Sequence, residues 1–451
     1  MLEQTNEQEA DSQDDVHLKS QDRYKWALSR SNAHFATPKG ADLFDRLELY
    51  SEWIAARTEL GFWPYARTLE TAPQPIASIG YAGKQGRSSI NLAVQDYLGL
   101  ATHPMITEAA ERAIRDFGVH SAGSAMLVGN NPLSQKLELS ISEFVHAEHV
   151  LLFPTGWAAG FGAVTGLVRD TDHIVLDALA HACLQTGSSA ATKKLHRYRH
   201  LDVDHAEELL RKIRADDRTN AILVIAEGLY SMDSDTPDLV RLQSICSEYN
   251  AKLLVDVAHD LGALGEGGRG FLADKQILGN VDIVMGAFSK SFASNGGFIA
   301  TKDFRVKKYL QWFANPHTFS NALSPIQCAI VETAIGIIRS AEGDQLRSQL
   351  MSKSQYFRAR LQEHGLDVLG IPSAIVPVLI GREAVARMAS RFVDRSGTST
   401  NLVEFPAVGL GAARFRCQLM ATHTDSQLAT AADDIAKGIS EARGEYSKMP
   451  Q

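Results

Sequence analysis

Lys290 is the residue whose type and surroundings most directly suggest chemistry. The preceding stretch 281–286 is apolar and β-prone, so it predicts a buried strand, and the small residues after Lys290 include Gly296 and Gly297. An ammonium placed in such a space loses hydration, its pKa falls, and the neutral amine can form a Schiff base with a carbonyl. These residues alone leave open the alternative of a surface lysine just past a strand end.

Two further polar residues follow another predicted strand upstream. Residues 252–255 form a short apolar run, and Asp256 and His259 come at its carboxyl end. Ligands bind at that edge of open α/β sheets. There an acidic group can hold a protonated pyridine nitrogen, and an imidazole can donate to a ring oxygen. Taken singly, Asp256 could cap a helix and His259 could be an ordinary packed histidine. Together with Lys290 on successive strand ends, they favour a site.

Motifs in a fixed order extend over most of the chain, from about Asp96 to Thr424. On these motifs the chain resembles the α-oxoamine synthases, pyridoxal-phosphate (PLP) enzymes of fold type I that include serine palmitoyltransferase and 8-amino-7-oxononanoate synthase. The motifs are Asp96-Tyr-Leu-Gly-Leu100, Pro154-Thr-Gly-Trp-Ala158, His181-Ala-Cys183, Glu227-Gly-Leu-Tyr-Ser-Met-Asp233, Asp256-Val-Ala-His259, Phe288-Ser-Lys-Ser291, Gly296-Gly297, Phe319-Ser-Asn-Ala-Leu-Ser-Pro325 and Arg414-Phe-Arg-Cys417.

The resemblance implies a catalytic role for four residues. Lys290 matches the lysine that holds the cofactor aldehyde. Asp256 matches the aspartate that keeps the pyridine nitrogen protonated, so that the ring can accept electron density. His259 matches the histidine that hydrogen-bonds the phenolic oxygen, and His181 matches the histidine that stacks on the ring and orients the substrate.

The resemblance also implies how the rest of the cofactor is held. Gly156 and Trp157 match the pair whose backbone amides approach the phosphate at a helix N-terminus. Ser289 matches a hydroxyl on the phosphate side, and Ser231 matches a serine near the phenolic oxygen. Ser320 matches the residue that reaches the phosphate from a partner subunit, which implies a homodimer with shared active sites.

At the positions that bind substrate in the family, some residues of this chain match the family and others differ from it. Arg416 matches the arginine that clamps the amino-acid carboxylate, a bidentate task that suits its planar fork. Gln95, which stands in place of a frequent asparagine, is a second substrate-binding candidate. Further departures put the identity of both substrates in doubt; they are Val257, Asp260, Ala287, Ser134, Ala125 and Glu404.

The element pattern predicts an α/β fold with two domains. Short apolar runs separated by helical stretches indicate a mostly parallel sheet buried between helices. We expect an acidic, disordered tail over 1–40, a helix and strands over 41–100 that pack on the small domain, a large PLP-binding domain over 101–335, and a small C-terminal α/β domain over 336–445. This arrangement is that of a fold type I PLP-dependent transferase.

The composition excludes several classes of protein. The chain has 451 residues with 45% hydrophobic and 22% charged residues, which is ordinary for a globular protein. A net charge of −8 argues against nonspecific nucleic-acid binding. Four scattered cysteines have no metal-ligand spacing, so we expect reduced thiols and no metal site. Because no apolar stretch is long enough to span a membrane and no secretory signal is visible, we expect a cytoplasmic protein without integral membrane contact.

The predicted function is a PLP-dependent decarboxylative condensation of an amino acid with an acyl thioester, carried by coenzyme A or a carrier protein. The products would be a 2-amino ketone, CO2 and a free thiol, which makes the protein a C-acyltransferase. One alternative is another fold type I reaction, such as that of an aminotransferase or a decarboxylase. A second is a noncatalytic regulatory or scaffold subunit that keeps the fold without the chemistry.

Overall fold

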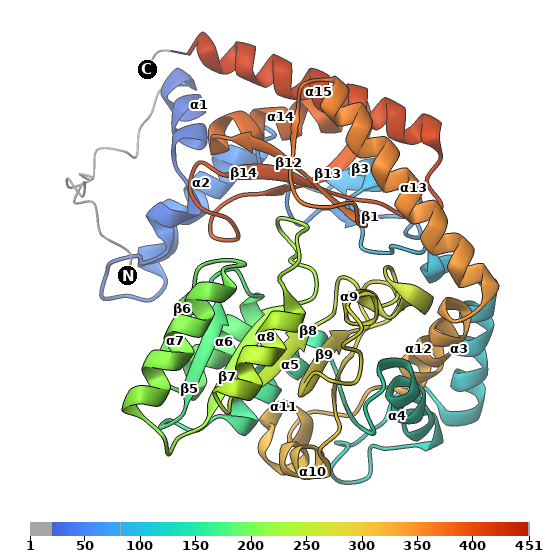
Figure 1. Cartoon of the computed structure of the whole chain (residues 1–451). Coiled ribbons are helices and arrows are strands. Elements are labelled where there is room, and N and C mark those ends of the chain that lie inside the picture. The colour runs from blue at the N-terminus through green and yellow to red at the C-terminus, as the bar shows by residue number, and fades with distance from the viewer. Residues whose placement is uncertain (1–19, 82, 450–451) are drawn as a thin grey trace.

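The computed structural model describes residues 20–81 and 83–449, so residues 1–19 of the predicted tail lie outside this range. Over 20–40 the expectation of disorder is wrong, because α1 (Ser20–Ser29) and a 3-10 turn (Asn32–Phe35) form there. Two seven-stranded sheets organise the chain. In Figure 1, the elements coloured from teal through green and yellow to gold surround one sheet, and the blue N-terminal and dark-orange-to-red C-terminal elements surround the other. We call these halves the large domain and the small domain. Both halves are α/β.

The large-domain sheet has the strand order β4-β10-β9-β8-β7-β5-β6. Neighbouring strands from β9 to β6 run parallel, whereas β10 is antiparallel to both β4 and β9. The sheet is therefore mostly parallel, as predicted. Its strands are β4 (His149–Phe153), β5 (His173–Asp177), β6 (Leu195–Tyr198), β7 (Ile222–Glu227), β8 (Lys252–Asp256), β9 (Ile283–Ala287) and β10 (Gly297–Thr301).

Helices bury both faces of this sheet. Alternate residues of one strand enter different cores: Ile174 packs with the helix that follows β4, whereas Val175 joins the larger core. This two-sided burial explains why the strands have apolar runs rather than alternating patterns. The helices of this half are α3 (Pro104–Phe117), α4 (Pro132–Val145), α5 (Gly156–Leu167), α6 (Ala182–Ala191), α7 (Val203–Asp216), α8 (Leu239–Glu248), α9 (Gly270–Asp274), α10 (Phe304–Phe313), α11 (Asn315–Thr318) and α12 (Pro325–Ile338).

The small-domain sheet joins strands from both ends of the chain, in the order β1-β2-β3-β13-β14-β12-β11. The link is the parallel pairing of β3 with β13. The strands are β1 (Thr68–Leu69), β2 (Ile76–Tyr81), β3 (Lys84–Leu92), β11 (Asp367–Val368), β12 (Ile375–Gly381), β13 (Thr398–Val403) and β14 (Ala413–Gln418). The helices are α1 (Ser20–Ser29), α2 (Glu48–Glu59), α13 (Ala341–Glu363), α14 (Glu383–Ser396) and α15 (Asp425–Ser447).

Five strands were not predicted: β1, β6, β10, β11 and β13, of which β1 and β11 have only two residues each. The strand β6 has the sequence LHRY, and β13 has TSTNLV, so neither presents an apolar run. The strand β10 begins at Gly297, inside a stretch that its small residues made look like a loop. The expected helix over 41–60 is also shorter, since a short 3-10 turn (Asp45–Leu47) precedes α2.

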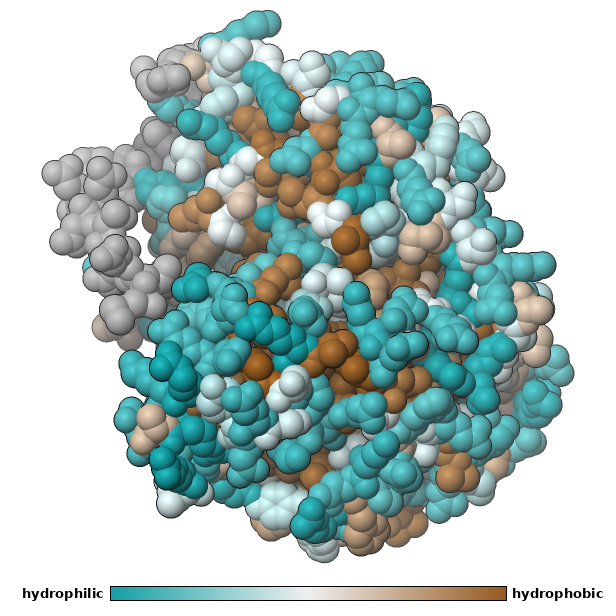
Figure 2. All heavy atoms as spheres, viewed as in Figure 1, coloured by the Kyte–Doolittle hydropathy of each residue, from teal (hydrophilic) through white to brown (hydrophobic). Residues whose placement is uncertain are grey.

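The surface and the cysteines agree with the composition. Figure 2 shows a mainly hydrophilic face with apolar residues between the two halves. The four cysteines are free and buried, as expected. Among the described residues, no helix is both long and apolar enough to cross a membrane.

Candidate active site

A cavity of about 320 Å³ lies at the carboxyl ends of the large-domain strands, with Arg416 of the small domain in its wall. Its volume is within the range of small-molecule sites. All but one of the residues predicted for the site line it. They are Gln95, Gly156, Trp157, His181, Ser231, Asp256, His259, Ser289, Lys290 and Arg416.

Lys290 reaches the cavity from the turn that follows β9. The strand ends at Ala287, three residues before the lysine. Burial lowers the pKa of the Lys290 amine from its ordinary value, although the charge of Asp256 opposes this change. A larger fraction of the amine is therefore neutral and nucleophilic at a given pH.

Asp256 is the last residue of β8 and lies at 5% exposure between the ends of two neighbouring strands. Its register partners are Glu227 of β7 and Met285 of β9. One carboxylate oxygen accepts the N–H of Ala258 at 2.9 Å. Among the described residues, no lysine or arginine forms an ion pair with Asp256. A protonated pyridine nitrogen would supply the cation that this buried carboxylate lacks.

His259 is supported by Tyr97, a residue that was not predicted to belong to the site. The Nδ1 of His259 is 2.8 Å from the hydroxyl of Tyr97, and both side chains are buried. Burial keeps the pKa of His259 well below its ordinary value, so the imidazole is neutral. When the Tyr97 hydroxyl donates to Nδ1, Nε2 carries the remaining proton and becomes a donor. The signal for Tyr97 was its place in the motif that begins at Asp96.

His181 and Glu227 form a second pair beside Asp256. His181 precedes α6, and its backbone N–H donates to a carboxylate oxygen of Glu227 at 2.5 Å. Burial raises the pKa of Glu227 well above its ordinary value, and the charge of Asp256 adds to this effect, so Glu227 is protonated. Glu227 also lines the cavity and was missed, although it ends β7 and opens a quoted motif.

The N-terminus of α5 provides a place for an anion. Thr155 caps this helix by accepting the N–H of Ala158 at 3.0 Å. A Cβ on Gly156 would lie only 2.4 Å from the Cβ of Ala287, so only glycine allows the helix start to approach β9 this closely. The amides at this helix start and the nearby Ser289 suit a phosphate group.

Over the part of the chain that the structure describes, Arg416 has no acidic partner. It lies on β14, opposite Asn401 of β13, and its Nη1 is 3.9 Å from the sulfur of Met232. Within the described residues, its buried Nε has no hydrogen-bond partner. The guanidinium is therefore free to bind a substrate carboxylate, with Gln95 in the same cavity wall.

Ser320 does not line the cavity of its own chain. It follows Phe319, which is 80% exposed, so the predicted reach of Ser320 into a partner's site stays a prediction. Two departures from the family have structural explanations. Glu404 is buried in an ion-pair cluster of the small domain, and Ser134 takes part in the capping of α4 with Asn131.

The cavity fits PLP. A reactive amine, an unpaired buried carboxylate and a helix start suited to phosphate lie around one space of the required size.

Comparisons with known proteins agree with this fit. The aminotransferase class I and II family model matches residues 87–435. An 8-amino-7-oxononanoate synthase from Geobacter sulfurreducens is 34% identical over 353 residues, which are 78% of this chain and 89% of that protein.

Solved structures are similar over most of the chain. A serine palmitoyltransferase from Sphingomonas wittichii superposes with a TM-score of 0.81 at 29% identity, covering 91% of this chain and 100% of that one. A serine palmitoyltransferase from S. paucimobilis with bound PLP has a TM-score of 0.83 at 26% identity, covering 89% of this chain and 100% of that one. The chain therefore belongs to the aminotransferase class I and II family and, within it, to the PLP-dependent α-oxoamine synthases.

Proposed function

We propose that the protein condenses an amino acid with an acyl thioester, releasing CO2 and a thiol and yielding a 2-amino ketone. The observation that carries this proposal is the unpaired Arg416 guanidinium in the same cavity as Lys290 and Asp256. This arrangement binds a carboxylate beside a reactive amine. The names of the relatives and structural neighbours support the same class of reaction.

The protein's residues divide the work between binding and proton transfer. Arg416 holds the carboxylate of the amino acid, which fixes the orientation of its Cα–H bond. The Lys290 amine takes the Cα proton, because burial lowers its pKa and so raises the fraction of the amine that is neutral. Bound PLP supplies an electron sink for the resulting carbanion, which Asp256 supports by keeping the ring nitrogen protonated. His181 lies in the same wall and orients the substrate.

Carbon–carbon bond formation comes next, followed by loss of the thiol and of CO2. The Cα carbon bonds to the thioester carbonyl, the carbon–sulfur bond breaks, and the departing thiolate takes a proton from solvent to become the free thiol. The bond from Cα to the carboxylate breaks next, and CO2 leaves. A proton returned to Cα by Lys290 completes the 2-amino ketone. Burial raises the pKa of Glu227 and lowers the pKa of His259, which favours the neutral, hydrogen-bond-donating form of both side chains.

Product analysis tests the proposal directly. Purified protein loaded with PLP is incubated with a panel of amino acids and with acyl groups carried on coenzyme A or on a carrier protein. We expect CO2 and free thiol in equal amounts, only when both substrates are present, together with a 2-amino ketone whose mass is that of the two substrates less CO2 and the thiol. A 2-oxo acid alone would indicate an aminotransferase, and CO2 without thioester a decarboxylase. A colourless, inactive protein would indicate a noncatalytic subunit.

We also propose a homodimer in which Ser320 of one subunit contacts the cofactor phosphate of the other. Two segments support it because they lie side by side and expose large apolar residues. Ser124 and Asn321 form a β-bridge between them. Leu127 is 79% exposed, Val128 87% and Phe319 80%, and a second copy would remove these side chains from water.

Sedimentation equilibrium tests the dimer. The expected mass is twice that of the chain, and Val128→Asp should shift it toward the monomer while weakening PLP binding. A monomer that binds PLP fully would contradict the shared site. The cytoplasmic location that the composition favours also remains a proposal, which fractionation of the producing cells would test.

A further inference from the structure

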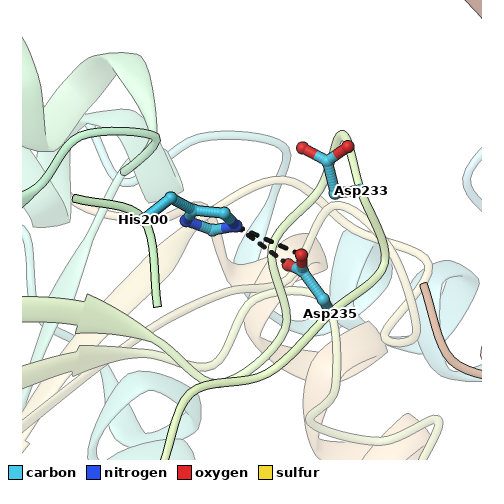
Figure 3. A group of neighbouring side chains, drawn as sticks. All are labelled: His200, Asp233 and Asp235. Carbon is cyan, nitrogen blue, oxygen red and sulfur yellow. Dashed lines mark hydrogen bonds and ion pairs between the residues drawn. The ribbon is translucent and has the colours of Figure 1, made fainter. Parts of the chain in front are cut away.

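A second group of ionisable side chains lies beside the catalytic cavity and consists of His200, Asp233 and Asp235 (Figure 3). His200 follows β6, and the two aspartates lie in the loop that follows β7. Their potential ligand atoms are within 4.8 Å of one another, so a metal ion is the first occupant to consider. Figure 3 shows the imidazole directed at Asp235, with Asp233 near the tip of the same loop.

The contacts of these side chains argue against a metal ion. The Nδ1 of His200 is 2.8 Å from Asp177, and its Nε2 is 3.2 Å from Asp235. Asp233 pairs with the guanidinium of Arg414. A metal ligand needs a free lone pair on the imidazole, and the Arg414 cation already occupies the Asp233 carboxylate.

His200 instead behaves as a cation held between two carboxylates. Burial opposes its charge, but the hydrogen bonds and charges of Asp177 and Asp235 outweigh burial and raise the pKa of His200 to about 10. The rings of His200 and Tyr230 also pack in a T-shaped arrangement, with centroids 4.5 Å apart and an interplanar angle of 89°. His200 thus ties β5, through Asp177, to the loop that carries Asp235.

The loop over residues 230–235 is closed upon itself and reaches the cavity. The N–H of Tyr230 donates to the carbonyl of Asp235 at 2.9 Å, and the N–H of Ser234 donates to the carbonyl of Tyr230 at 2.9 Å. Between these anchors, Ser231 and Met232 line the cavity. Movement of Asp235 would therefore move two cavity residues.

The other side of the same loop is bound to the small domain. The N–H of Ile371 donates to the carbonyl of Ser234 at 2.7 Å, and the hydroxyls of Ser234 and Ser373 are 2.8 Å apart. Gly370 has φ +70°, and a Cβ there would lie 2.0 Å from the carbonyl oxygen of Asp233. The 230–235 loop therefore packs against the backbone at Gly370 and leaves no room for a side chain.

Two arginines of β14 also contact the loop. Arg414 donates to the carbonyl of Met232 at 3.2 Å, in addition to its pair with Asp233. Arg416, the proposed carboxylate clamp, contacts the sulfur of Met232. The loop therefore connects the large domain to the residue that we expect to bind the amino acid.

We propose that His200 is a positioning residue: by bridging Asp177 and Asp235 it fixes the 230–235 loop, so that Ser231 faces the cofactor site and Met232 supports Arg416. The consequence for catalysis rests on the proposed function. The consequence for the loop itself does not, because it concerns contacts that exist without cofactor or substrate.

The first test uses His200→Gln and Asp235→Asn, which keep the side-chain size and remove the charged bridge. His364→Gln is the matched control, because His364 also pairs with an aspartate, Asp433, but on the surface far along the chain. In protein without PLP, amide hydrogen exchange at residues 230–235 should quicken in both variants and stay unchanged in the control. Unchanged exchange in both variants would overturn the proposal. Should His200→Gln fail to fold, Asp235→Asn carries the test.

The second test measures amino-acid binding from the change in the PLP absorption spectrum. The dissociation constant should rise about tenfold in either variant, as expected for loss of one charged hydrogen bond, and the double variant should be no worse than either single one. The KM for the thioester should not change. Equal weakening of both substrates, or additive effects, would overturn the positioning role.

The same measurements separate the possible failures. If the wild type binds amino acids but forms no ketone, the proposed function fails while this inference stands. If a chelator abolishes amino-acid binding and added Zn²⁺ or Mn²⁺ restores it, the cluster is a metal site and the inference fails.

Discussion

Two regions of this molecule bury charged side chains, and they do so in opposite ways. In the small domain, Glu404 lies between Arg57 at 3.0 Å and Arg387 at 2.7 Å. Tyr65 donates to the same carboxylate at 3.0 Å, and Trp53 lies 4.5 Å from the Arg57 guanidinium. Here two guanidinium cations share one carboxylate, and each also donates to a backbone carbonyl at 3.0 Å: Arg57 to that of Phe62 and Arg387 to that of Leu28.

The catalytic cavity leaves its charged groups without such partners. Among the described residues, Asp256, Lys290 and Arg416 form no ion pair within 4 Å, although they share one cavity. Leaving buried charges unpaired costs stability. The comparison indicates that the small-domain cluster stabilises the fold, whereas the charged groups of the cavity are positioned to bind ligands. Each change below should therefore affect either stability or chemistry, but not both.

The largest effect is expected from Asp256→Asn. The amide keeps the size but cannot hold the ring nitrogen protonated, so condensation should fall by about 10³-fold or more, while the urea midpoint of the protein without PLP should not fall. Steady-state product formation and urea unfolding measure the two quantities. Activity within tenfold of the wild type would remove Asp256 from the chemistry.

Glu404→Gln should do the reverse. It leaves two buried arginines without a carboxylate, which should lower the free energy of unfolding by about 3 kcal/mol. The kcat of the folded, PLP-loaded fraction should stay near that of the wild type. A loss of turnover without a loss in urea resistance would mean that Glu404 serves the reaction, and the contrast between the two regions would fail.

Arg416→Lys sharpens the comparison inside the cavity. A lysine keeps the charge but loses the planar fork, so the KM for the amino acid should rise about 10- to 100-fold, with a smaller change in the KM for the thioester. Initial-rate kinetics with each substrate varied in turn measures this. Equal rises for both substrates would contradict a dedicated carboxylate clamp.

The smallest expected effect is a shift along the pH axis. Because burial lowers the pKa of Lys290, its amine loses its proton at a lower pH than an ordinary lysine. The rate at which the apo protein captures PLP should therefore rise with pH, with a midpoint below the usual value of about 10.4. Stopped-flow absorbance between pH 6 and 11 follows this rate; a midpoint at or above that of free lysine would contradict the burial effect.

The fold and the central site were predictable where the signal is local. The apolar runs of β8 and β9 mark buried strands, and the rule for strand ends brings Asp256 and Lys290 to one edge of the sheet. The strand β13 lacks such a run because its residues include Thr398 and Asn401, and its place next to β3 depends on pairing between distant segments.

The parts of the site that were missed depend on lateral neighbours. Glu227 gains its raised pKa from burial beside Asp256, which requires β7 to lie next to β8. Tyr97 supports His259 across 162 residues of chain, and its motif alone did not show what it contacts. The proposed role of Ser320 requires a second subunit, so one chain alone cannot place it at a phosphate.

The account depends most on the amine of Lys290 and its covalent hold on PLP. Borohydride reduction of the PLP-loaded protein, followed by peptide mapping with mass spectrometry, tests this directly. We predict one pyridoxyl group per chain, on the peptide that contains Lys290, and none in Lys290→Ala. A tag on another lysine, or no tag in the wild type, would contradict the assignment of the active site.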